Sequence, residues 1–569
     1  MPEDLAELVS QAQGFNAGPQ FARQLLDSLE IGFSVEPEDL SRIPARGPAV
    51  IVANHPFGAA EGLILMVLLE SVRNDFKIVA NSLLSMFPAV TSHSLLVNPF
   101  ETARARTENL APLRQSLDWL SRGGLLATFP AGEVAHLSWE ERSVTDPPWK
   151  TTAARLALRT KSPVLPVFFD GANTLPFHLA GLIHPRLRTF NLPREFCKLR
   201  GKTVRLRIGR AIQFQRLAEY GDSALATEYL RSRTFLLSYR FRRASKPMGP
   251  SELPTVRTGG LPGSGRRLAE EVAALPEDRE LASNSEFAVY LARAFEIPAL
   301  LDEIGRCREA AFRLAGEGAG KEKDLDRFDE TYQHLVLWNK AEQRLAGGYR
   351  LGITTDLLHR GGALSLYTNT LFRYDPEFFN RVGPAIELGR SFVCAEYQRN
   401  YSSLLMLWKG IARFVERHPQ APVLFGPVSI SREYHEISRG LIATYLSDRE
   451  SHELARMVSP RVRFQGAQRH RSVRRLAALT ASLDDLSRSI ADIEEDGKGV
   501  PVLIRHYLKS GGKLLGFNVD HNFSGVLDAL ILADLRTADP AMLERYMGRA
   551  EAQAFLAYHR RKNYLLADA

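Results

Sequence analysis

The chain has 569 residues, more than one hydrophobic core usually supports, so its length predicts two globular domains. Hydrophobic residues make up 45% and charged residues 24%, which excludes a disordered, collagen-like or coiled-coil protein. The formal net charge of +8 favours an anionic partner: a membrane surface, a nucleic acid or an acidic protein.

Cysteine spacing and the lengths of apolar runs indicate the compartment. Cys197, Cys307 and Cys394 form no Cys-x-x-Cys pair, so neither a zinc site nor a disulfide framework is predicted. The N-terminal sequence lacks the pattern of a secretory signal. No apolar run approaches the roughly 20 residues that span a bilayer. We therefore expect a cytoplasmic protein without a metal site or a membrane span.

The first half of the chain alternates short apolar runs with longer amphipathic ones. Strands are predicted at 49–55, 76–82, 94–99, 125–130, 163–171 and 203–212. Residues 107–124 read as a helix that ends at glycine. This alternation is typical of an α/β fold and predicts a domain over residues 1–242. Residues 243–283 are rich in Pro, Gly, Ser and Arg, and are predicted to form a linker.

A second α/β domain is predicted over residues 284–569. Residues 286–315 are predicted to be helical, and further helices are expected at 402–418 and 432–446. Strands are predicted at 334–339, 346–353, 385–393, 422–431 and 513–520. Residues 540–561 read as a terminal amphipathic helix that packs on the domain. The halves share no internal repeat, so two different folds are expected.

The first chemical motif is IVANHPFGAAEGLIL, residues 51–65. His55 follows a predicted strand, and Glu61 lies six positions later, where a helix begins. Such a strand-to-helix connection places both side chains at the carboxyl edge of a sheet. A carboxylate that orients one imidazole nitrogen leaves the other free to act as a base. The alternative is a turn histidine and an ordinary first-turn helix acid, and the spacing alone favours that alternative.

Two further segments change this balance. Residues 128–136, TFPAGEVAH, supply a strand end and a Phe-Pro turn, and residues 161–170, KSPVLPVFFD, supply a later strand with Pro166. In this order the three segments resemble the lysophospholipid acyltransferase family, with its His-x4-Asp motif, Phe-Pro-Glu-Gly turn and Val-Pro strand. The resemblance covers residues 40–215 and implies a glycerolipid-acyltransferase-like α/β domain.

This resemblance assigns roles to the motif residues. It implies that His55 removes a proton from an acceptor hydroxyl that attacks an acyl thioester, while Glu61 orients the imidazole. The residues implied to bind substrate are Asn54, Phe129, Pro130, Gly132 and Glu133. Glu133 either holds a polar head group or is an ordinary N-terminal helix acid. Glu61 lies one residue further from the histidine than in the family, so a bulge around Gly58 is expected to realign it.

The motif also departs from the family in its anion-binding features. The acid of the Phe-Pro turn follows the glycine, and the arginine with which the family grips phosphate has no clear equivalent nearby. Both departures argue against a glycerol-phosphate acceptor. The variant pattern instead resembles the branch of the family that acylates amino-acid lipids.

In the second half, acids and arginines stand beside predicted strands. The order Asp-x-Phe-Asp, Tyr-Arg-Leu and Glu-x-x-Arg resembles the GNAT-like acyl-homoserine-lactone synthases and, more closely, ornithine-lipid N-acyltransferases. The resemblance covers residues 286–535 and implies a GNAT-like α/β fold. The residues implied to form its site are Asp326, Asp329, Arg350, Glu387 and Arg390.

An amine acceptor suits these residue types. An amine must lose a proton before it attacks a thioester, so a base such as Glu387 is needed, directly or through water. Asp326 or Asp329 is suited to a cationic substrate group, and Arg390 to the carboxylate of an amino acid. The alternative for these charges is a surface salt-bridge network.

The thioester donor is indicated by a missing glycine. GNAT enzymes bind the pyrophosphate of coenzyme A with a glycine-rich loop at a helix N-terminus, but residues 396–408, EYQRNYSSLLMLW, contain no glycine. Acyl carrier protein presents phosphopantetheine and an acidic surface, which suits this loop and the positive net charge. We expect acyl carrier protein to carry the acyl group, with coenzyme A left open as the alternative donor, and no bound cofactor.

Together the chain resembles the bifunctional ornithine-lipid synthases. The resemblance implies that the second domain N-acylates an amino acid with a 3-hydroxyacyl group and that the first domain O-acylates the resulting lyso-lipid. It favours ornithine as the amino acid and leaves glycine, glutamine and lysine open. A lipid product without a membrane span predicts peripheral attachment to the inner face of the cytoplasmic membrane. The alternatives are a lysophosphatidate acyltransferase with an accessory GNAT-like domain, and a non-catalytic basic membrane-binding protein. No motif indicates nucleic-acid binding.

Overall fold

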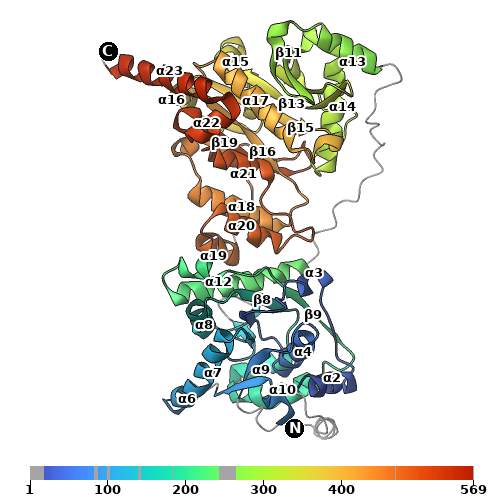
Figure 1. Cartoon of the computed structure of the whole chain (residues 1–569), viewed down its shortest axis with the longest axis vertical. Helices are drawn as coiled ribbons and strands as arrows, with labels where there is room; N and C mark the ends of the chain where they lie inside the picture. The colour runs from blue at the N-terminus through green and yellow to red at the C-terminus, as the bar shows by residue number, and fades with distance from the viewer. Residues whose placement is uncertain are drawn as a thin grey trace. The chain divides into compact units, whose positions relative to one another are not determined.

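The structure, a computed structural model, describes residues 18–81, 88–98, 103–138, 143–183, 185–241, 264–467 and 470–567. The chain forms two compact units (Figure 1). Unit 1 comprises Met1–Arg243 and Ala478–Gly499, and unit 2 comprises Ala244–Ala477 and Val500–Ala569. The predicted domain over residues 284–569 is therefore wrong in one respect, because Ala478–Gly499 belongs to unit 1. Within the described ranges, no helix is long and apolar enough to cross a membrane.

Unit 1 contains a seven-stranded sheet in the order β1-β9-β8-β2-β5-β3-β4. Its strands are β1 Gly32–Ser34, β2 Ala49–Ala53, β3 Phe76–Asn81, β4 Ser94–Val97, β5 Leu125–Thr128, β8 Val164–Phe169 and β9 Thr203–Ile208. Neighbouring strands are parallel except for β8 and β9. Every residue of β2, β5 and β8 is buried, as expected for strands covered on both faces. Each strand predicted in this half is confirmed.

Helices cover this sheet and account for its burial. They are α2 Gly18–Ser28, α3 Pro37–Leu40, α4 Ala59–Glu70, α5 Pro88–Thr91, α6 Ala103–Glu108, α7 Leu110–Ser121, α8 Thr152–Thr160, α9 Leu175–Ile183, α10 Pro185–Cys197, α11 Phe214–Ala218, α12 Ser223–Leu236 and α20 Leu483–Ala491. In α4 all residues from Leu63 to Leu69 are buried, so this helix lies inside the core. The structure adds a small hairpin, β6 His136–Ser138 and β7 Ser143–Thr145, which the sequence pattern did not predict.

Unit 2 contains an eight-stranded sheet in the order β10-β11-β12-β13-β15-β16-β19-β18. Its strands are β10 Glu280–Ser283, β11 Phe287–Arg293, β12 Gln333–Asn339, β13 Arg344–Ile353, β15 Ala385–Val393, β16 Val423–Ile430, β18 Lys513–Asp520 and β19 Val526–Asp534. A separate pair joins β14 Phe372–Tyr374 to β17 Val458–Pro460. All strands predicted in this half are confirmed, while β10, β11, β14, β17 and β19 were not predicted.

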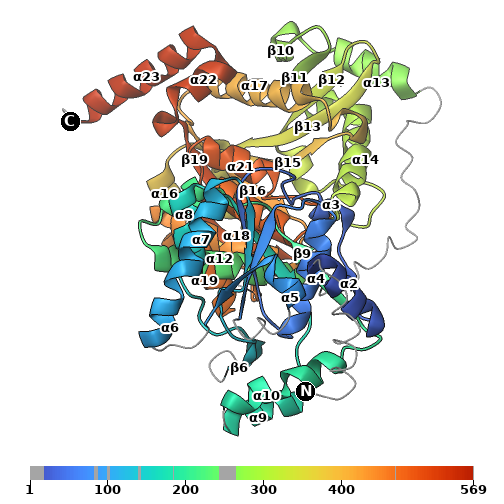
Figure 2. The same ribbon diagram turned by 60° about the horizontal axis from the view of Figure 1, so that its bottom comes forward.

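Unit 2 also contains helices, some of which pack on this sheet, while the last one extends away from the sheet in both views (Figures 1 and 2). They are α13 Ser264–Ala273, α14 Pro298–Leu314, α15 Thr354–Gly361, α16 Phe378–Val382, α17 Tyr401–Arg417, α18 Glu436–Arg449, α19 Arg471–Leu479, α21 Val502–Lys509, α22 Pro540–Met547 and α23 Arg549–Ala567. The long helix α17 packs across β10, β11, β12 and β13, and α14 packs on β13 and β15. The predicted helices at 402–418 and 432–446 are confirmed.

Strands β15 and β16 separate near the middle of the sheet. Among the strands that the structure describes, they form the only parallel pair of this sheet, which joins Ala385–Glu387 to Val423–Phe425 at three positions. Beyond these positions β15 remains paired with β13, and β16 with β19. Gly426 stands where the strands part, and a Cβ atom there would lie 2.1 Å from the Leu388 carbonyl oxygen. The close approach of two backbones explains the glycine.

Three predicted elements differ from the structure. Residues 286–315 are a strand followed by a helix rather than helix throughout, because β11 pairs with both β10 and β12 and Pro298 opens α14. The predicted linker 243–283 is wrong from residue 264 onward, since α13 and β10 fold there, and residues 243–263 lie outside the described ranges. The predicted terminal helix is interrupted at Gly548, whose φ of 99° ends α22.

Candidate active sites

His55 and Glu61 meet at the carboxyl edge of the unit 1 sheet. His55 stands two residues beyond β2, and Glu61 lies in the first turn of α4. The imidazole Nδ1 lies 3.4 Å from Glu61 Oε1, and the His55 side chain is 16% exposed, whereas that of Glu61 is fully buried. The predicted partnership is therefore present in space. A solvent-reachable imidazole beside a buried carboxylate has the geometry of a general base with an orienting acid.

The turn before α4 realigns Glu61, as its sequence spacing requires. Gly58 adopts a φ of 106°, a conformation open to glycine and strained for other residues. Glu61 Oε1 accepts hydrogen bonds from the backbone N–H groups of Phe57, at 2.6 Å, and Gly58, at 3.2 Å. The same carboxylate thus caps the helix and contacts the imidazole. The explanation of Glu61 as a first-turn helix acid therefore holds, and the same oxygen also lies beside the imidazole, as the predicted orienting role requires.

Asp146 is a second acid at this site, and sequence reasoning did not find it. Its Oδ1 accepts a hydrogen bond from the backbone N–H of His55 at 3.1 Å, and its Oδ2 accepts one from Trp149 Nε1 at 2.9 Å. The residue is 2% exposed, and burial raises the pKa of Asp146 to about 6. Asp146 lies 91 positions from His55 in the chain, so no local spacing reveals it.

Burial alone would lower the pKa of His55, but the charges of Glu61 and Asp146 outweigh burial and raise it above the usual value. We expect Glu61→Gln to move the titration of His55 to lower pH, because the charged imidazolium loses its nearest stabilising carboxylate while the burial remains. Carbethoxylation reports the neutral imidazole and can be followed at His55 by peptide mass mapping across pH. His93 in the same variant serves as the control, and an unchanged or raised midpoint at His55 would contradict the expectation.

Of the residues predicted to bind substrate in unit 1, four lie in the turn that contacts His55, and Asn54 lies against β8. Phe129 stacks on the His55 ring, with centroids 4.5 Å apart, and Gly132 turns the chain with a φ of 74°. Pro130 is buried and Glu133 is exposed in the same turn. The predicted contact of Asn54 with substrate is not supported, because its side-chain amide donates to the Phe169 carbonyl at 2.9 Å and accepts from the Phe169 N–H at 2.7 Å. Asn54 therefore joins the end of β2 to the end of β8 by hydrogen bonds.

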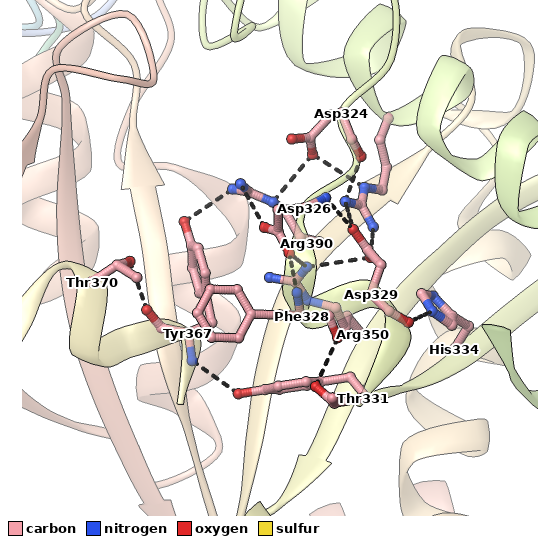
Figure 3. Close-up of polar contacts among 12 residues, drawn as sticks. Asp324, Asp326, Phe328, Asp329, Thr331, His334, Arg350, Tyr367, Thr370 and Arg390 are labelled. Carbon is pink, nitrogen blue, oxygen red and sulfur yellow. Dashed lines mark hydrogen bonds and ion pairs between the residues drawn. The ribbon is translucent and has the colours of Figure 1, made fainter. Parts of the chain in front are cut away.

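In unit 2 four of the five predicted charged residues, all except Glu387, gather with two further residues in one cluster (Figure 3). We call it the arginine–aspartate cluster, and its members are Arg308, Arg350, Arg390, Asp324, Asp326 and Asp329. Arg308 and Arg350 are each 1% exposed. The cluster holds equal numbers of positive and negative groups, so its charges balance. It is a buried network rather than the surface network given as the alternative.

Individual contacts show how this cluster is held. Arg308 Nη1 donates to Asp329 at 2.8 Å, and its Nε to Asp324 at 3.1 Å. Arg350 Nη1 donates to Asp326 at 2.6 Å. Burial raises the pKa of Asp329, but Arg308 and Arg350 outweigh it and hold that pKa well below the usual range. Asp329 is therefore a charged partner of these arginines within the protein.

Arg390 connects this cluster to the point where β15 and β16 separate. Its Nε lies 3.1 Å from Asp324 Oδ2, and its Nη1 donates to the Tyr367 hydroxyl at 3.0 Å. The guanidinium lies between the rings of Tyr367 and Phe523. Arg390 also adopts a φ of 50°, a strained conformation that is concentrated at functional sites. Because its guanidinium already pairs with aspartates, free capture of a substrate carboxylate by Arg390, as predicted, is not supported.

Glu387 lies at the last paired position of β15 with β16. The carboxylate is 1% exposed, and it accepts hydrogen bonds from the Tyr332 hydroxyl and from the backbone N–H of Thr368. The Tyr332 hydroxyl in turn accepts the Tyr367 N–H at 2.9 Å. Each carboxylate oxygen already accepts a hydrogen bond from the protein's own donors. The predicted role of Glu387 as a base, directly or through water, therefore stays a prediction that these contacts do not support.

An acidic group with one oxygen that has no hydrogen-bond partner lies nearby on β19. Asp528 pairs in register with Ser429, in the part of β16 that has separated from β15. The residue is 4% exposed, and its Oδ2 has no hydrogen-bond partner. Burial raises the pKa of Asp528 well above its usual range, and the neighbouring Asp520 and Glu317 raise it further. Burial likewise raises the pKa of Glu317 to about 7.

The residues missed in unit 2 carry little local signal. Arg308 sits in a helix of mixed charge, and Asp528 interrupts the apolar run VLDALILAD, where a buried acid is unusual. That interruption of the apolar run was the one sign in the sequence that Asp528 belongs to a site. In the described part of the chain, no group of three or more His, Cys, Asp and Glu side chains is arranged to hold a metal.

Comparisons with known proteins assign both units. Residues 20–242 match the family described as Acyltransferase, and residues 307–409 match the acetyltransferase (GNAT) domain. The glycine N(alpha)-acyltransferase of Bacteroides thetaiotaomicron is 30% identical over 279 residues, which cover 46% of this chain and 81% of that protein.

Two further similarities concern lipid acylation. The lyso-glycine lipid O-acyltransferase of Phocaeicola vulgatus is 27% identical over 207 residues, which cover 35% of this chain and 70% of that protein. A solved structure, the 1-acyl-sn-glycerophosphate acyltransferase PlsC from Thermotoga maritima, is 17% identical and covers 40% of this chain and 85% of that chain, with a TM-score of 0.24.

Proposed function

This chain belongs to the acyltransferase family that includes glycine N(alpha)-acyltransferase, and we propose that it makes an amino-acid lipid by two successive acyl transfers. Unit 2 joins a 3-hydroxyacyl chain to an amino acid, and unit 1 esterifies the hydroxyl of that chain. The observation that carries the proposal is that one chain is similar both to an N-acyltransferase and to a lyso-lipid O-acyltransferase. The tether would raise the local concentration of the shared intermediate.

In the first transfer, the amino nitrogen loses a proton and attacks the thioester carbonyl, the C–S bond breaks, and an amide and a free thiol form. The edges of β15 and β16 beyond Glu387 and Phe425 no longer pair with each other. Such edges suit the extended phosphopantetheine arm, whose amides can hydrogen-bond to backbone groups as an added strand would. Helix α17 begins at Tyr401 without a glycine, which supports acyl carrier protein as the donor.

Two carboxylates are suited to the acceptor amine. Asp528 lies along the separated part of β16, and its unpartnered Oδ2 lacks a donor that an ammonium group would supply. Its neighbour Glu317, with a pKa of about 7, is suited to accept a proton near neutral pH. Glu387 takes a positioning role in this scheme, because it holds the Tyr332 hydroxyl.

The amino acid that unit 2 acylates is either glycine, with one ammonium group, or ornithine, with two. The curated relatives are named for glycine, whereas we propose ornithine as the acceptor. The carboxylates of Glu317, Asp520 and Asp528 exceed what a single α-ammonium needs, and they suit a substrate with a second ammonium group. Arg390 is held at the same end of the sheet but already paired with aspartates.

In the second transfer, His55 takes the proton of the 3-hydroxyl as its oxygen attacks a second thioester, and an ester forms while the thiol leaves. The charges of Glu61 and Asp146 stabilise the imidazolium that results. The stacked ring of Phe129 limits the orientations of the imidazole. No phosphate-binding group is required by a lyso-lipid whose head is an amino acid.

We propose that unit 1 attaches peripherally to the membrane that holds the lyso-lipid. Helices α9 and α10 lie side by side in both views (Figures 1 and 2). They expose Leu175, Leu179 and Phe190, which are 66%, 49% and 80% exposed, and the exposed Arg194 and Lys198 follow nearby. Apolar side chains next to basic ones suit an anionic lipid surface.

The purified chain, given 3-hydroxyacyl and acyl thioesters of acyl carrier protein with either ornithine or glycine, is the direct test. We expect ornithine to yield a two-chain lipid by mass spectrometry, and Asp528→Asn to reduce use of ornithine more than use of glycine, because glycine lacks the second ammonium. Exclusive use of glycine would contradict the choice of ornithine. Absence of any acylated amino acid, with coenzyme A thioesters also tried, would contradict the function.

A further inference from the structure

The segment Ala478–Gly499 comes from the second half of the sequence but is part of unit 1. We call it the inserted segment. Its helix α20 and the following turn bury Leu486, Ile490 and Ile493, each at most 2% exposed. The chain therefore leaves unit 2 after Ala477 and returns to it at Val500. The first unit is not complete in residues 1–243.

Asp485 joins the inserted segment to two elements of the acyltransferase unit. The residue is 1% exposed, and its carboxylate accepts hydrogen bonds from Arg216 Nε at 2.9 Å and from the Tyr229 hydroxyl. Arg216 also donates to the Leu479 carbonyl at 2.7 Å and lies over the rings of Tyr220 and Tyr229. A charged side chain so deeply buried requires its partner.

Asp492 makes a second connection, about two helical turns further along. It is fully buried, and its Oδ2 pairs with Arg233 of α12, which is 1% exposed. Its Oδ1 accepts the backbone N–H of Arg210 at 3.1 Å, just after β9. Arg233 also donates to the Tyr229 hydroxyl at 2.7 Å, so Tyr229 joins the two connections.

The same helix, α12, reaches the candidate catalytic site. Arg231 donates to Thr145 Oγ1 at 3.0 Å and to the Asp146 carbonyl at 3.1 Å. Phe235, one turn further on, lies against Trp149, whose indole N–H donates to Asp146. Asp146 in turn accepts the backbone N–H of His55. A continuous set of contacts therefore leads from the inserted segment through α12 to His55.

We propose that the inserted segment positions the O-acylation site: Asp485 and Asp492 hold α12, and α12 holds Asp146 and the backbone of His55. The proposal rests on the proposed function of unit 1. It makes the first unit's chemistry dependent on residues supplied by the second half of the sequence. Asp485 and Asp492 are positioning residues, because they act through α12 and do not touch the reacting atoms.

The test uses full-length Asp492→Asn, with Glu495→Gln, an exposed residue of the same segment, as the matched control. A synthetic N-(3-hydroxyacyl) amino acid and acyl carrier protein thioester measure O-acylation, and N-acylation is measured in the same preparation. We expect kcat for O-acylation to fall about 10- to 100-fold with KM nearly unchanged, because misplacement of a base affects the reaction more than binding. N-acylation and the Glu495→Gln variant should match the unaltered protein.

The outcomes separate this inference from the function on which it rests. If the unaltered chain does not O-acylate the substrate, the proposed function fails. If the unaltered chain does O-acylate it, and Asp492→Asn keeps the kcat of the unaltered chain or changes only KM, the positioning role is overturned. Should Asp492→Asn lose both activities through misfolding, Tyr229→Phe decides, since it removes only the hydroxyl that joins Arg233 to Asp485. An unchanged kcat for O-acylation in that variant overturns the proposal.

Discussion

His55→Ala is expected to lower O-acylation about 1,000-fold and to leave N-acylation intact, so that the lyso-lipid accumulates. General bases typically contribute 100- to 10,000-fold to a rate, about the size of this loss. His55 is the partly exposed imidazole beside Glu61 and Asp146 at the sheet edge. The measurement is mass spectrometry of lipids from cells that make the variant, together with single-transfer assays of the purified chain.

His93→Gln provides the matched control for this loss. His93 is a partly buried histidine of the same unit, and its Nδ1 lies 3.0 Å from the Ser92 hydroxyl rather than beside a carboxylate. It should preserve both transfers. If the N-acylated product accumulates in His55→Ala but not in His93→Gln, the result agrees with N-acylation first and O-acylation second. Two-chain lipid made at the normal rate by His55→Ala would exclude the imidazole as the base.

Arg308→Leu is expected to destabilise unit 2 by about 3–5 kcal/mol, the usual cost of removing one partner from a buried ion pair. The substitution leaves Asp324 and Asp329 without their shared arginine in a site where all three residues are at most 5% exposed. Because these aspartates also hold Arg350 and Arg390, N-acylation should fall as well. Urea denaturation, with hydrogen exchange of the β13 and β15 amides as the readout, measures the loss of unfolding free energy in unit 2.

Arg327→Leu is the control for lost charge and lost side-chain size. Arg327 is exposed in the same stretch of chain and lies over the Phe328 ring outside the cluster. It should change the free energy of unfolding by less than about 1 kcal/mol, as exposed charged residues do. Equal stability of Arg308→Leu and the unaltered chain would mean that the arginine–aspartate cluster does not stabilise unit 2.

Local sequence spacing was sufficient for one part of the first site. His55 and Glu61 are six residues apart across a strand, a glycine turn and a helix start, and all three carry local signals. The contacts of Asn54 were not predicted for a related reason: the position of Asn54 beside His55 is local, but its hydrogen bonds go to Phe169, which is 115 positions away. Local spacing predicts that a side chain lies near the edge of a sheet, but it does not predict which distant backbone groups will hydrogen-bond to that side chain.

The second site was identified by its residues but not by their arrangement. The motif order located Asp326, Asp329, Arg350, Glu387 and Arg390 near one another. Their mutual pairing makes them a buried network, and Glu387 has both oxygens occupied by Tyr332 and Thr368. Which charges face a substrate and which face each other depends on the packing of α14, β13 and β15. No spacing along the chain contains that information.

By itself, the sequence determined most of the secondary structure, the two-domain organisation and the pairing of His55 with Glu61, because apolar periodicity and turn residues act over a few positions. Only the tertiary structure decided the strand order, the burial of the arginine–aspartate cluster, the contact of Asp146 with His55 and the membership of Ala478–Gly499 in unit 1. Each of these joins residues far apart in the chain. Their contacts are selected by the burial of charge and apolar surface in the whole fold, which local pattern does not record.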